Sequence, residues 1–236
     1  MCIRVVLAGS LALVVPARAQ TRSPVDGLDA YPNILAAGLV VAAVSGTSWD
    51  DFVKTRLLAP LEMTSATTSV LDLWDGADVA RCYHCDLPGR IVGYERAKIA
   101  NIVMPHVLTD SGVVPIPWRT VDNIGPAGAI NANVVDAAKW IRMHLARGAY
   151  RGRRILSAGT VDELHSPQML VSSAPPFPFG HFYAYGMGWF LSDYRGRKLV
   201  LHGGTVTGFV STIALLPEEQ LGVAVQIGRA SCRERV

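Results

Sequence analysis

The hydrophobic pattern of the first half of the chain predicts helices followed by loops. Residues 34–44, ILAAGLVVAAV, are apolar on every side and long enough for a buried helix, which the following Ser-Gly pair would end. A second helix is expected to begin at Ser48, whose side chain can cap it, and to end at Pro60. Residues 61–125 carry many prolines and glycines, so we expect them to be rich in loops.

Two further helices are expected before the pattern changes. Asn133 can cap a helix that runs from about Val134 to Arg147 and has an apolar face. Ser157 can cap a shorter helix, which Pro167 would close. Both caps are short polar side chains that can accept the free N–H groups of a first helical turn.

The last third of the chain has the pattern of antiparallel strands. Residues 185–204 form two extended runs around a turn at 194–197, and residues 208–226 form two more around 217–220. In residues 209–216, FVSTIALL, both alternating sets are apolar, which is typical of a strand covered on both faces. Helices followed by strands predict a mixed α/β (α+β) domain, an antiparallel sheet flanked by helices with a further helical layer.

Length and composition place the chain among well-packed globular proteins. It has 236 residues, of which 50% are hydrophobic and 17% charged, and this excludes a disordered chain. Residues 1–19 combine Arg4, an apolar run over Val5–Val15 and a small residue on either side of Arg18. This predicts a secretory signal cleaved before Gln20, and hence a periplasmic or secreted protein. The apolar run is too short to span a bilayer.

The last ten residues, IGRASCRERV, do not continue the strand pattern before them. They match the translation of a common sequencing adapter at all ten positions, so we expect residues 227–236 to be an artefact and residues 20–226 to be the domain. Setting both ends aside removes five arginines and one glutamate and leaves 17 basic and 18 acidic residues. The apparent basicity therefore predicts no nucleic-acid or membrane-surface partner.

Cysteine and histidine spacing gives no metal site. Outside the two ends only Cys82 and Cys85 remain, and a single Cys-x-x-Cys cannot complete a tetrahedral zinc site. The six histidines show no His-x-x-x-His or His-x-His spacing. We expect a local disulfide or two thiols at the cysteine pair, and no metal or other cofactor.

The usual nucleophile motifs are missing from the sequence. There is no Gly-x-Ser-x-Gly elbow, and no serine stands three positions before any of the lysines Lys54, Lys98, Lys139 and Lys198. This absence constrains the function more than any motif that is present.

Four segments, taken in order, resemble one family of enzymes, the serine hydrolases related to class C β-lactamases and penicillin-binding proteins. They are residues 44–69, 113–145, 152–168 and 185–225, which cover most of 36–226 in the family's usual order. The resemblance implies a β-lactamase/transpeptidase-like fold. It also implies acyl transfer to a serine, with hydrolysis of a small acyl substrate: an ester, a β-lactam or a D-Ala-D-Ala-type peptide.

The resemblance also implies three motifs: Ser-x-x-Lys, Tyr-x-Asn with the phenol as base, and His/Lys-x-Gly on an edge strand facing the acyl group. Tyr31 and Asn33 in YPN match the second motif, and His202, Gly203 and Gly204 match the third. It thus implies Tyr31 and His202 as catalytic residues and Asn33, Gly203 and Gly204 as substrate-binding residues. No nucleophile is assigned, and the oligomeric state is left open.

Three functions follow as hypotheses. Because the family's Ser-x-x-Lys lies well upstream of Tyr-x-Asn, we expect a copy of the hydrolase truncated at both ends and inactive as given. The alternative is a secreted non-catalytic binding protein that retains the family groove. A third, an enzyme that uses Ser65 or Ser69 beside His202, has only the presence of serines behind it.

Overall fold

The computed structural model describes residues 6–8, 32–73, 103, 105–116, 118, 120–171, 175, 177–178 and 180–228. Tyr31, Cys82 and Cys85 lie outside these residues, as do the tail from residue 229 and most of the expected signal segment. Three residues of that segment form a short strand, β1 (Val6–Ala8), which pairs with β4 (Asn131–Asn133).

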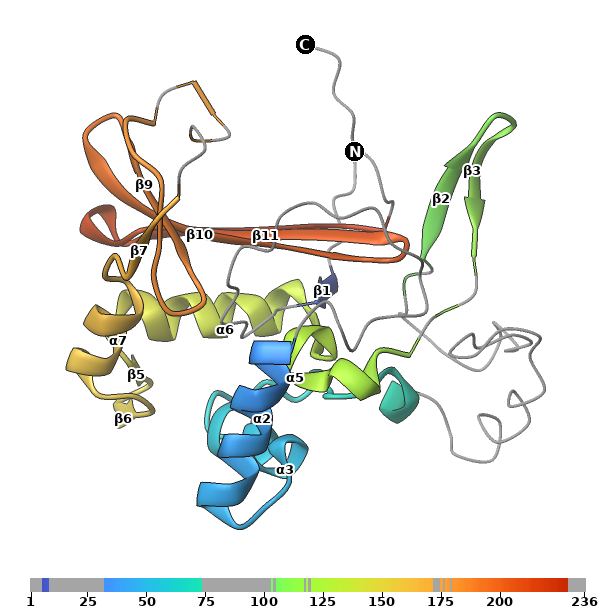
Figure 1. Cartoon of the computed structure of the whole chain (residues 1–236), viewed down its shortest axis with the longest axis horizontal. Helices are drawn as coiled ribbons and strands as arrows, with labels where there is room; N and C mark the ends of the chain where they lie inside the picture. The colour runs from blue at the N-terminus through green and yellow to red at the C-terminus, as the bar shows by residue number, and fades with distance from the viewer. Residues whose placement is uncertain are drawn as a thin grey trace.

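At the centre of the fold is an antiparallel sheet of six strands in the order β12-β11-β10-β9-β8-β7, so that neighbours in the chain are neighbours in the sheet (Figure 1). The strands are β7 (Met169–Leu170), β8 (Ala184–Tyr185), β9 (Phe190–Tyr194), β10 (Arg197–Val206), β11 (Phe209–Leu216) and β12 (Leu221–Ile227). Both predicted hairpins, β9–β10 and β11–β12, are confirmed. In the β9–β10 turn Arg195 and Gly196 have φ values of 51° and 77°. Two such residues in succession match the twist of a two-residue hairpin.

The helices begin where the polar caps were predicted. The side chains of Ser48, Asn133 and Ser157 each accept a hydrogen bond from the backbone N–H three residues later. The helices are α2 (Pro32–Ser45), α3 (Trp49–Val53), α5 (Gly125–Gly128), α6 (Val134–Leu145) and α7 (Ala158–Leu164). The α3 helix continues as a π-helical stretch, η1 (Lys54–Leu58), and ends before Pro60, as expected.

Smaller elements connect these helices and strands. Two-stranded hairpins are formed by β2 (His106–Thr109) with β3 (Gly112–Pro115), and by β5 (Ala149–Tyr150) with β6 (Arg153–Arg154). Short 3-10 helices are η2 (Val70–Leu73), η5 (Asp122–Ile124) and η6 (Pro217–Glu219). The predicted fold class, a mixed α/β domain with an antiparallel sheet flanked by helices, is confirmed. In the described part of the chain no helix is long and apolar enough to cross a membrane.

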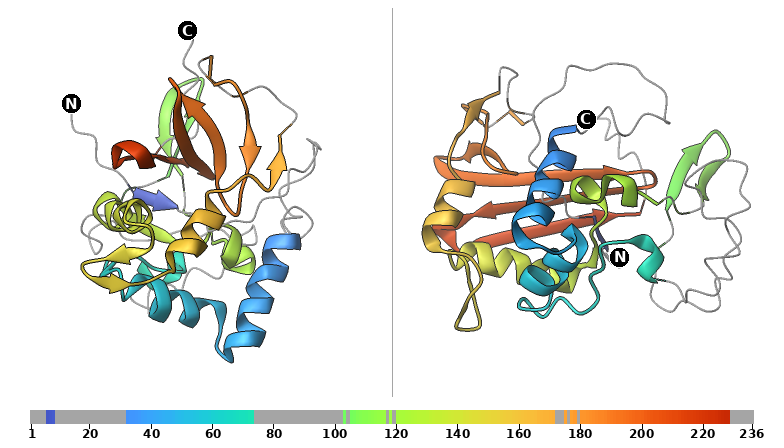
Figure 2. Two further views of the ribbon diagram at one scale, coloured as in Figure 1. Left: turned by 90° about the vertical axis from the view of Figure 1, so that its left-hand side faces the viewer. Right: turned by 60° about the horizontal axis from the view of Figure 1, so that its bottom comes forward.

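The main core lies between α6 and one face of the sheet (Figure 2). Val200, Ile213 and Leu215 of the sheet belong to the same buried cluster as Ile141 of α6. The helix comes closest at Gly222, where a Cβ atom would lie 2.2 Å from Cγ2 of Ile141. Any side chain at position 222 would push the helix off the strand, so this glycine sets the spacing of the two layers.

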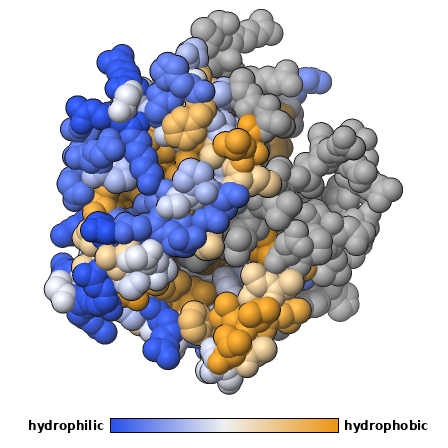
Figure 3. Space-filling view, turned by 60° about the vertical axis from the view of Figure 1, so that its left-hand side comes forward, coloured by the Kyte–Doolittle hydropathy of each residue, from blue (hydrophilic) through white to orange (hydrophobic). Residues whose placement is uncertain are grey.

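The prediction that the first helix is buried is wrong for one of its sides. Gly38 lies against α5, and a Cβ atom there would be 2.2 Å from Cγ of Pro126. Leu39 and Val44, however, are 71% and 80% exposed. The described neighbours of α2 are α3 and α5, which leave its other side open. In the face of the molecule that Figure 3 shows, apolar side chains gather near the lower edge.

The prediction that the strand at 209–216 is covered on both faces is also wrong for the described residues. Its odd-numbered residues are buried and its even-numbered ones are half-buried or exposed. On the neighbouring strand β12, Leu221, Val223 and Val225 are between 42% and 50% exposed. The reason is that α6 covers one face of these strands, and no described helix covers the other.

Candidate active site

The strand that carries the predicted His-Gly-Gly motif is open along part of one edge. On one side β10 pairs with β11 from Val200 to Val206. On the other side it pairs with β9 only from Arg197 to Leu201. From His202 onwards that edge therefore has no strand partner among the described residues. Such an edge presents backbone N–H and C=O groups that can bind an extended chain.

The two glycines of the motif lie in this open stretch. Gly203 is exposed, and a Cβ atom on it would meet its nearest described atoms, the Ser211 carbonyl and the Thr212 hydroxyl, at 3.6 and 3.8 Å. These are ordinary contacts, so packing within the sheet does not require glycine at position 203. A residue without a side chain here instead lets another molecule approach the backbone closely.

His202 is the first residue of β10 beyond the end of β9, and its ring is held by aromatic side chains. Its Nε2 atom lies 3.3 Å from the Tyr185 hydroxyl. The Phe190 ring stacks on the imidazole at 5.6 Å between ring centroids, with 27° between the planes. Burial lowers the pKa of His202, and a hydrogen bond to the Gly203 backbone partly opposes this. The imidazole is therefore neutral at pH 7.

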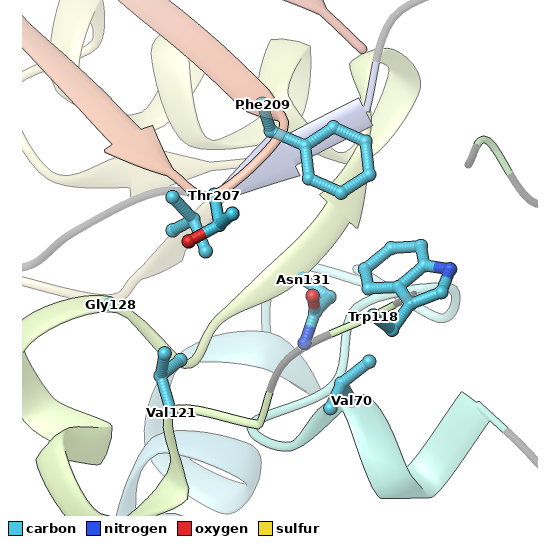
Figure 4. Close-up of a pocket in the computed structure, with 8 residues that line it drawn as sticks. Val70, Trp118, Val121, Gly128, Asn131, Thr207 and Phe209 are labelled. Carbon is cyan, nitrogen blue, oxygen red and sulfur yellow. The ribbon is translucent and has the colours of Figure 1, made fainter. Parts of the chain in front are cut away.

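A pocket adjoins the far end of the open edge (Figure 4). Its cavity volume is only about 20 Å³, room for little more than one water molecule, and Val206 belongs both to the open edge and to the pocket wall. Trp118 and Phe209 form an aromatic side, with ring centroids 4.9 Å apart. Asn131 is anchored through its Nδ2 atom, which donates to the Ala129 carbonyl at 2.9 Å. The full lining is Val70, Trp118, Val121, Gly128, Asn131, Val206, Thr207 and Phe209.

The predicted site residues are only partly brought together. His202, Gly203 and Gly204 lie side by side on β10. Asn33 is the second residue of α2, but its side chain lies outside the described part of the structure, as Tyr31 does entirely. The roles of Tyr31 and Asn33 therefore stay predictions.

The two serines of the third hypothesis have other partners. The Ser69 hydroxyl donates to Asp122 Oδ2 at 2.6 Å and accepts the backbone N–H of Leu71. Burial raises the pKa of Asp122, and the hydrogen bond from Ser69 opposes the rise. The backbone N–H of Ser65 donates to the buried carboxylate of Asp136. Sequence reasoning missed the Ser69–Asp122 pair because its members are 53 residues apart.

A second histidine environment was also missed. His144 and His165 are 2% and 5% exposed, and their Nδ1 and Nε2 atoms lie 3.1 Å apart. Trp189 packs edge-on against both rings. Burial, followed by the neighbouring His165, lowers the pKa of His144 to about 3. Among the described residues, no three His, Cys, Asp or Glu side chains are placed to hold a metal ion.

Comparison with known proteins agrees with this fold. The Beta-lactamase family model matches residues 17–230, so the chain belongs to the Beta-lactamase family, which includes the penicillin-binding-protein-like serine hydrolases. The resemblance stated from the sequence is thereby confirmed.

Two curated relatives are similar over most of the chain. Unguisins hydrolase ungD' of Aspergillus campestris is 27% identical over 200 residues, which cover 83% of this chain and 32% of the relative. Penicillin-binding protein 4 of Amycolatopsis lactamdurans is 26% identical over 181 residues, which cover 76% and 41%. The chain thus spans roughly a third of the length of the curated relatives it matches.

Solved structures show the same fold. The penicillin-binding protein homologue from Pyrococcus abyssi has a TM-score of 0.61 at 23% identity, covering 82% of this chain and 36% of that one. A D-stereospecific amidohydrolase from Streptomyces has a TM-score of 0.57 at 18% identity, covering 84% and 48%.

Proposed function

We propose that the open edge of β10 binds an acyl compound in an extended form, as an added strand. The observation that carries this proposal is the edge from His202 to Val206, which lacks a strand partner among the described residues. The exposed Gly203 beside it supports close approach to the backbone.

Among acyl compounds, amides and peptides are the favoured ligands, and β-lactams and esters are further candidates. Membership of the Beta-lactamase family supports acyl substrates in general. Proteins of similar structure include a D-stereospecific amidohydrolase and a D-amino acid amidase. A neutral amide suits a site in which His202 is held uncharged.

Acyl transfer needs more than this edge. It requires a nucleophile activated by a base and donors for the oxyanion. The 236 residues contain no Ser-x-x-Lys, so we infer that this chain binds the acyl compound without forming an acyl-serine. Both leading hypotheses, a family hydrolase and a binding protein that keeps the groove, require the edge to bind. They differ in whether a covalent intermediate forms.

The binding step can be tested by NMR with D-phenylalanine amide as the probe. We expect saturable shifts of the backbone amide signals of Gly203, Gly204 and Thr205, with no shift at Val223 on the opposite edge of the sheet. In parallel, the intact mass should stay unchanged after incubation with a fluorescent penicillin. A folded protein whose β10 signals do not respond would refute the binding site, and a covalent adduct would refute the non-acylating role.

The adjacent glycines offer a matched pair of variants. Side chains of successive strand residues point to opposite faces, so a methyl group at 203 and one at 204 probe different surroundings. We expect Gly203→Ala, which places a methyl group where the ligand would approach the exposed backbone, to weaken probe binding roughly tenfold. Gly204→Ala adds its methyl group on the opposite face and should change binding less than about twofold. Equal effects of both variants would argue against close approach at Gly203.

A further inference from the structure

We propose that the β5–β6 hairpin and the adjoining end of α6 form a basic surface that binds a membrane rich in anionic phospholipids. This arginine patch consists of five exposed side chains: Arg142, Arg147, Arg151, Arg153 and Arg154. Residues 142–154 contain no acidic residue. The near balance of charge over the whole domain therefore hides a local excess, and a charged partner responds to the local field. The proposal does not depend on the function of the β10 edge.

Contacts around Tyr150 bring arginines from different elements onto one surface. The guanidinium groups of Arg142 on α6 and Arg151 in the hairpin turn lie over the Tyr150 ring, 5.6 and 5.7 Å from its centre. The Nη1 atom of Arg154 donates to the Arg147 carbonyl at 2.6 Å. These contacts hold the charged groups in place before any partner binds, so binding costs less conformational entropy.

Carboxylates offset only part of the charge of the arginine patch. Asp162 pairs with Arg147, and Glu62 pairs with Arg151. The other three arginines have no ion-pair partner among the described residues. Three positive charges therefore remain uncompensated on one small surface, and each should strengthen binding to an anionic membrane about fivefold.

The shape of the arginine patch favours a membrane over a nucleic acid. The β5–β6 hairpin protrudes from the body of the protein, at the lower left of Figure 1 and of the right-hand view of Figure 2. A protruding tip can lie against a flat array of phosphate groups, to which the planar guanidinium groups donate. The Tyr150 ring beneath two of these groups is only 4% exposed, so it is not available to stack on a base.

The test measures cosedimentation of the full chain with lipid vesicles at low salt. Vesicles of equal parts phosphatidylglycerol and phosphatidylcholine present anionic phosphates, and vesicles of phosphatidylcholine alone are the neutral comparison. With three uncompensated charges, we expect binding on the order of a hundredfold tighter to the anionic vesicles, and weaker binding as salt is added. Equal affinity of the wild-type protein for the two kinds of vesicle would overturn the proposal, whatever the variants show.

Arg142 and Arg195 give a matched pair of variants. Both are exposed and lie over a tyrosine ring, and neither has an ion-pair partner among the described residues, but Arg195 belongs to the turn between β9 and β10. We expect Arg142→Gln to weaken binding to the anionic vesicles about fivefold, and Arg142→Gln with Arg153→Gln roughly 25-fold. Arg195→Gln should change it less than about twofold. All variants keep the same two ends of the chain, so the ends cannot cause a difference between them. Equal effects of Arg142→Gln and Arg195→Gln would refute the role of the patch.

Two further probes distinguish a membrane from other sources of phosphate. Inorganic phosphate and duplex DNA are added in place of vesicles, at the same concentration of phosphate groups. Weaker binding of both probes than of anionic vesicles would support the proposal. Binding of either probe that depends on Arg142 and Arg153, without binding to anionic vesicles, would identify a different phosphate partner and refute the membrane proposal.

Discussion

Trp189 and Phe190 are neighbours in the chain but pack on histidines in two different environments. Trp189 lies edge-on against His144 and His165, in a core corner formed by α6 and the end of α7. Phe190 stacks on His202 at the open edge of β10. The first pair is almost fully buried, and His202 is half-buried.

This difference in burial distinguishes two histidines that pack in the core, His144 and His165, from one that lies at the proposed binding site, His202. The pKa of His165 falls to about 4 through burial, then through the nearby Lys198, with Asp162 opposing. The two buried rings meet through Nδ1 of His144 and Nε2 of His165, while Nε2 of His144 has no hydrogen-bond partner among the described residues. His202, whose Nε2 atom lies 3.3 Å from the Tyr185 hydroxyl, stands at the start of a strand edge that has no strand partner among the described residues.

The largest effect should come from removing the aromatic side chain of the buried corner. Trp189 is 6% exposed, so Trp189→Ala should lower the free energy of unfolding by about 3–5 kcal/mol. The matched variant Phe190→Leu keeps an apolar side chain at the half-buried position and should cost about 1 kcal/mol. Urea unfolding followed by far-ultraviolet circular dichroism measures both. Similar losses of unfolding free energy in the two variants would contradict the distinction between the buried corner at Trp189 and the half-buried position of Phe190.

The second largest effect should be a loss of stability in mild acid, caused by the buried pair His144 and His165. The pKa values of His144 and His165, about 3 and about 4, lie below their ordinary value of 6.5, so below pH 6.5 the unfolded chain binds more protons than the folded one. Stability from this pair is therefore complete above about pH 6.5 and is lost as the pH falls towards 4 and then 3. We expect a loss on the order of 3 kcal/mol between pH 7 and pH 5, measured by urea unfolding.

Substitutions can distinguish the effect of this histidine pair on stability from the effects of other titrating groups. His165→Gln removes one of its two titrating rings and should flatten the pH dependence by about half. His202→Gln should leave most of it in place, because the pKa of His202 is lowered less strongly. A pH profile that is identical in wild type and His165→Gln would show that the pair does not control acid stability.

The parts of the fold that the sequence predicts correctly, the helix caps and a hairpin turn, depend on residues close together in the chain. Ser48, Asn133 and Ser157 cap helices through hydrogen bonds to residues three positions away, so a short window of sequence contains all the required information. The turn at Arg195-Gly196 is local in the same way. The order of such elements was enough to identify the family and the edge strand with His202.

Contacts between distant segments explain what was missed. The link from Tyr185 to His202 depends on β9 beginning only at Phe190, opposite Leu201, and periodicity does not reveal how far one strand extends along another. The exposure of Leu39 on α2 and of the even-numbered residues of β11 was misjudged for a related reason. An apolar pattern states that a side chain favours burial, but it does not state which element covers it.

The smallest expected effect concerns Gln226, a buried polar side chain that, unlike the three histidines, is hydrogen-bonded to no described polar group. Gln226 is 2% exposed, and neither atom of its amide has a hydrogen-bond partner among the described residues. Burying an unpaired amide is unfavourable, so Gln226→Leu should raise the free energy of unfolding by about 1–2 kcal/mol. Gln220 is the control, because it is exposed and its Nε2 atom donates to the Pro217 carbonyl at 2.9 Å. Gln220→Leu should be neutral or slightly destabilising, and a loss of stability in Gln226→Leu would show that its amide is hydrogen-bonded after all.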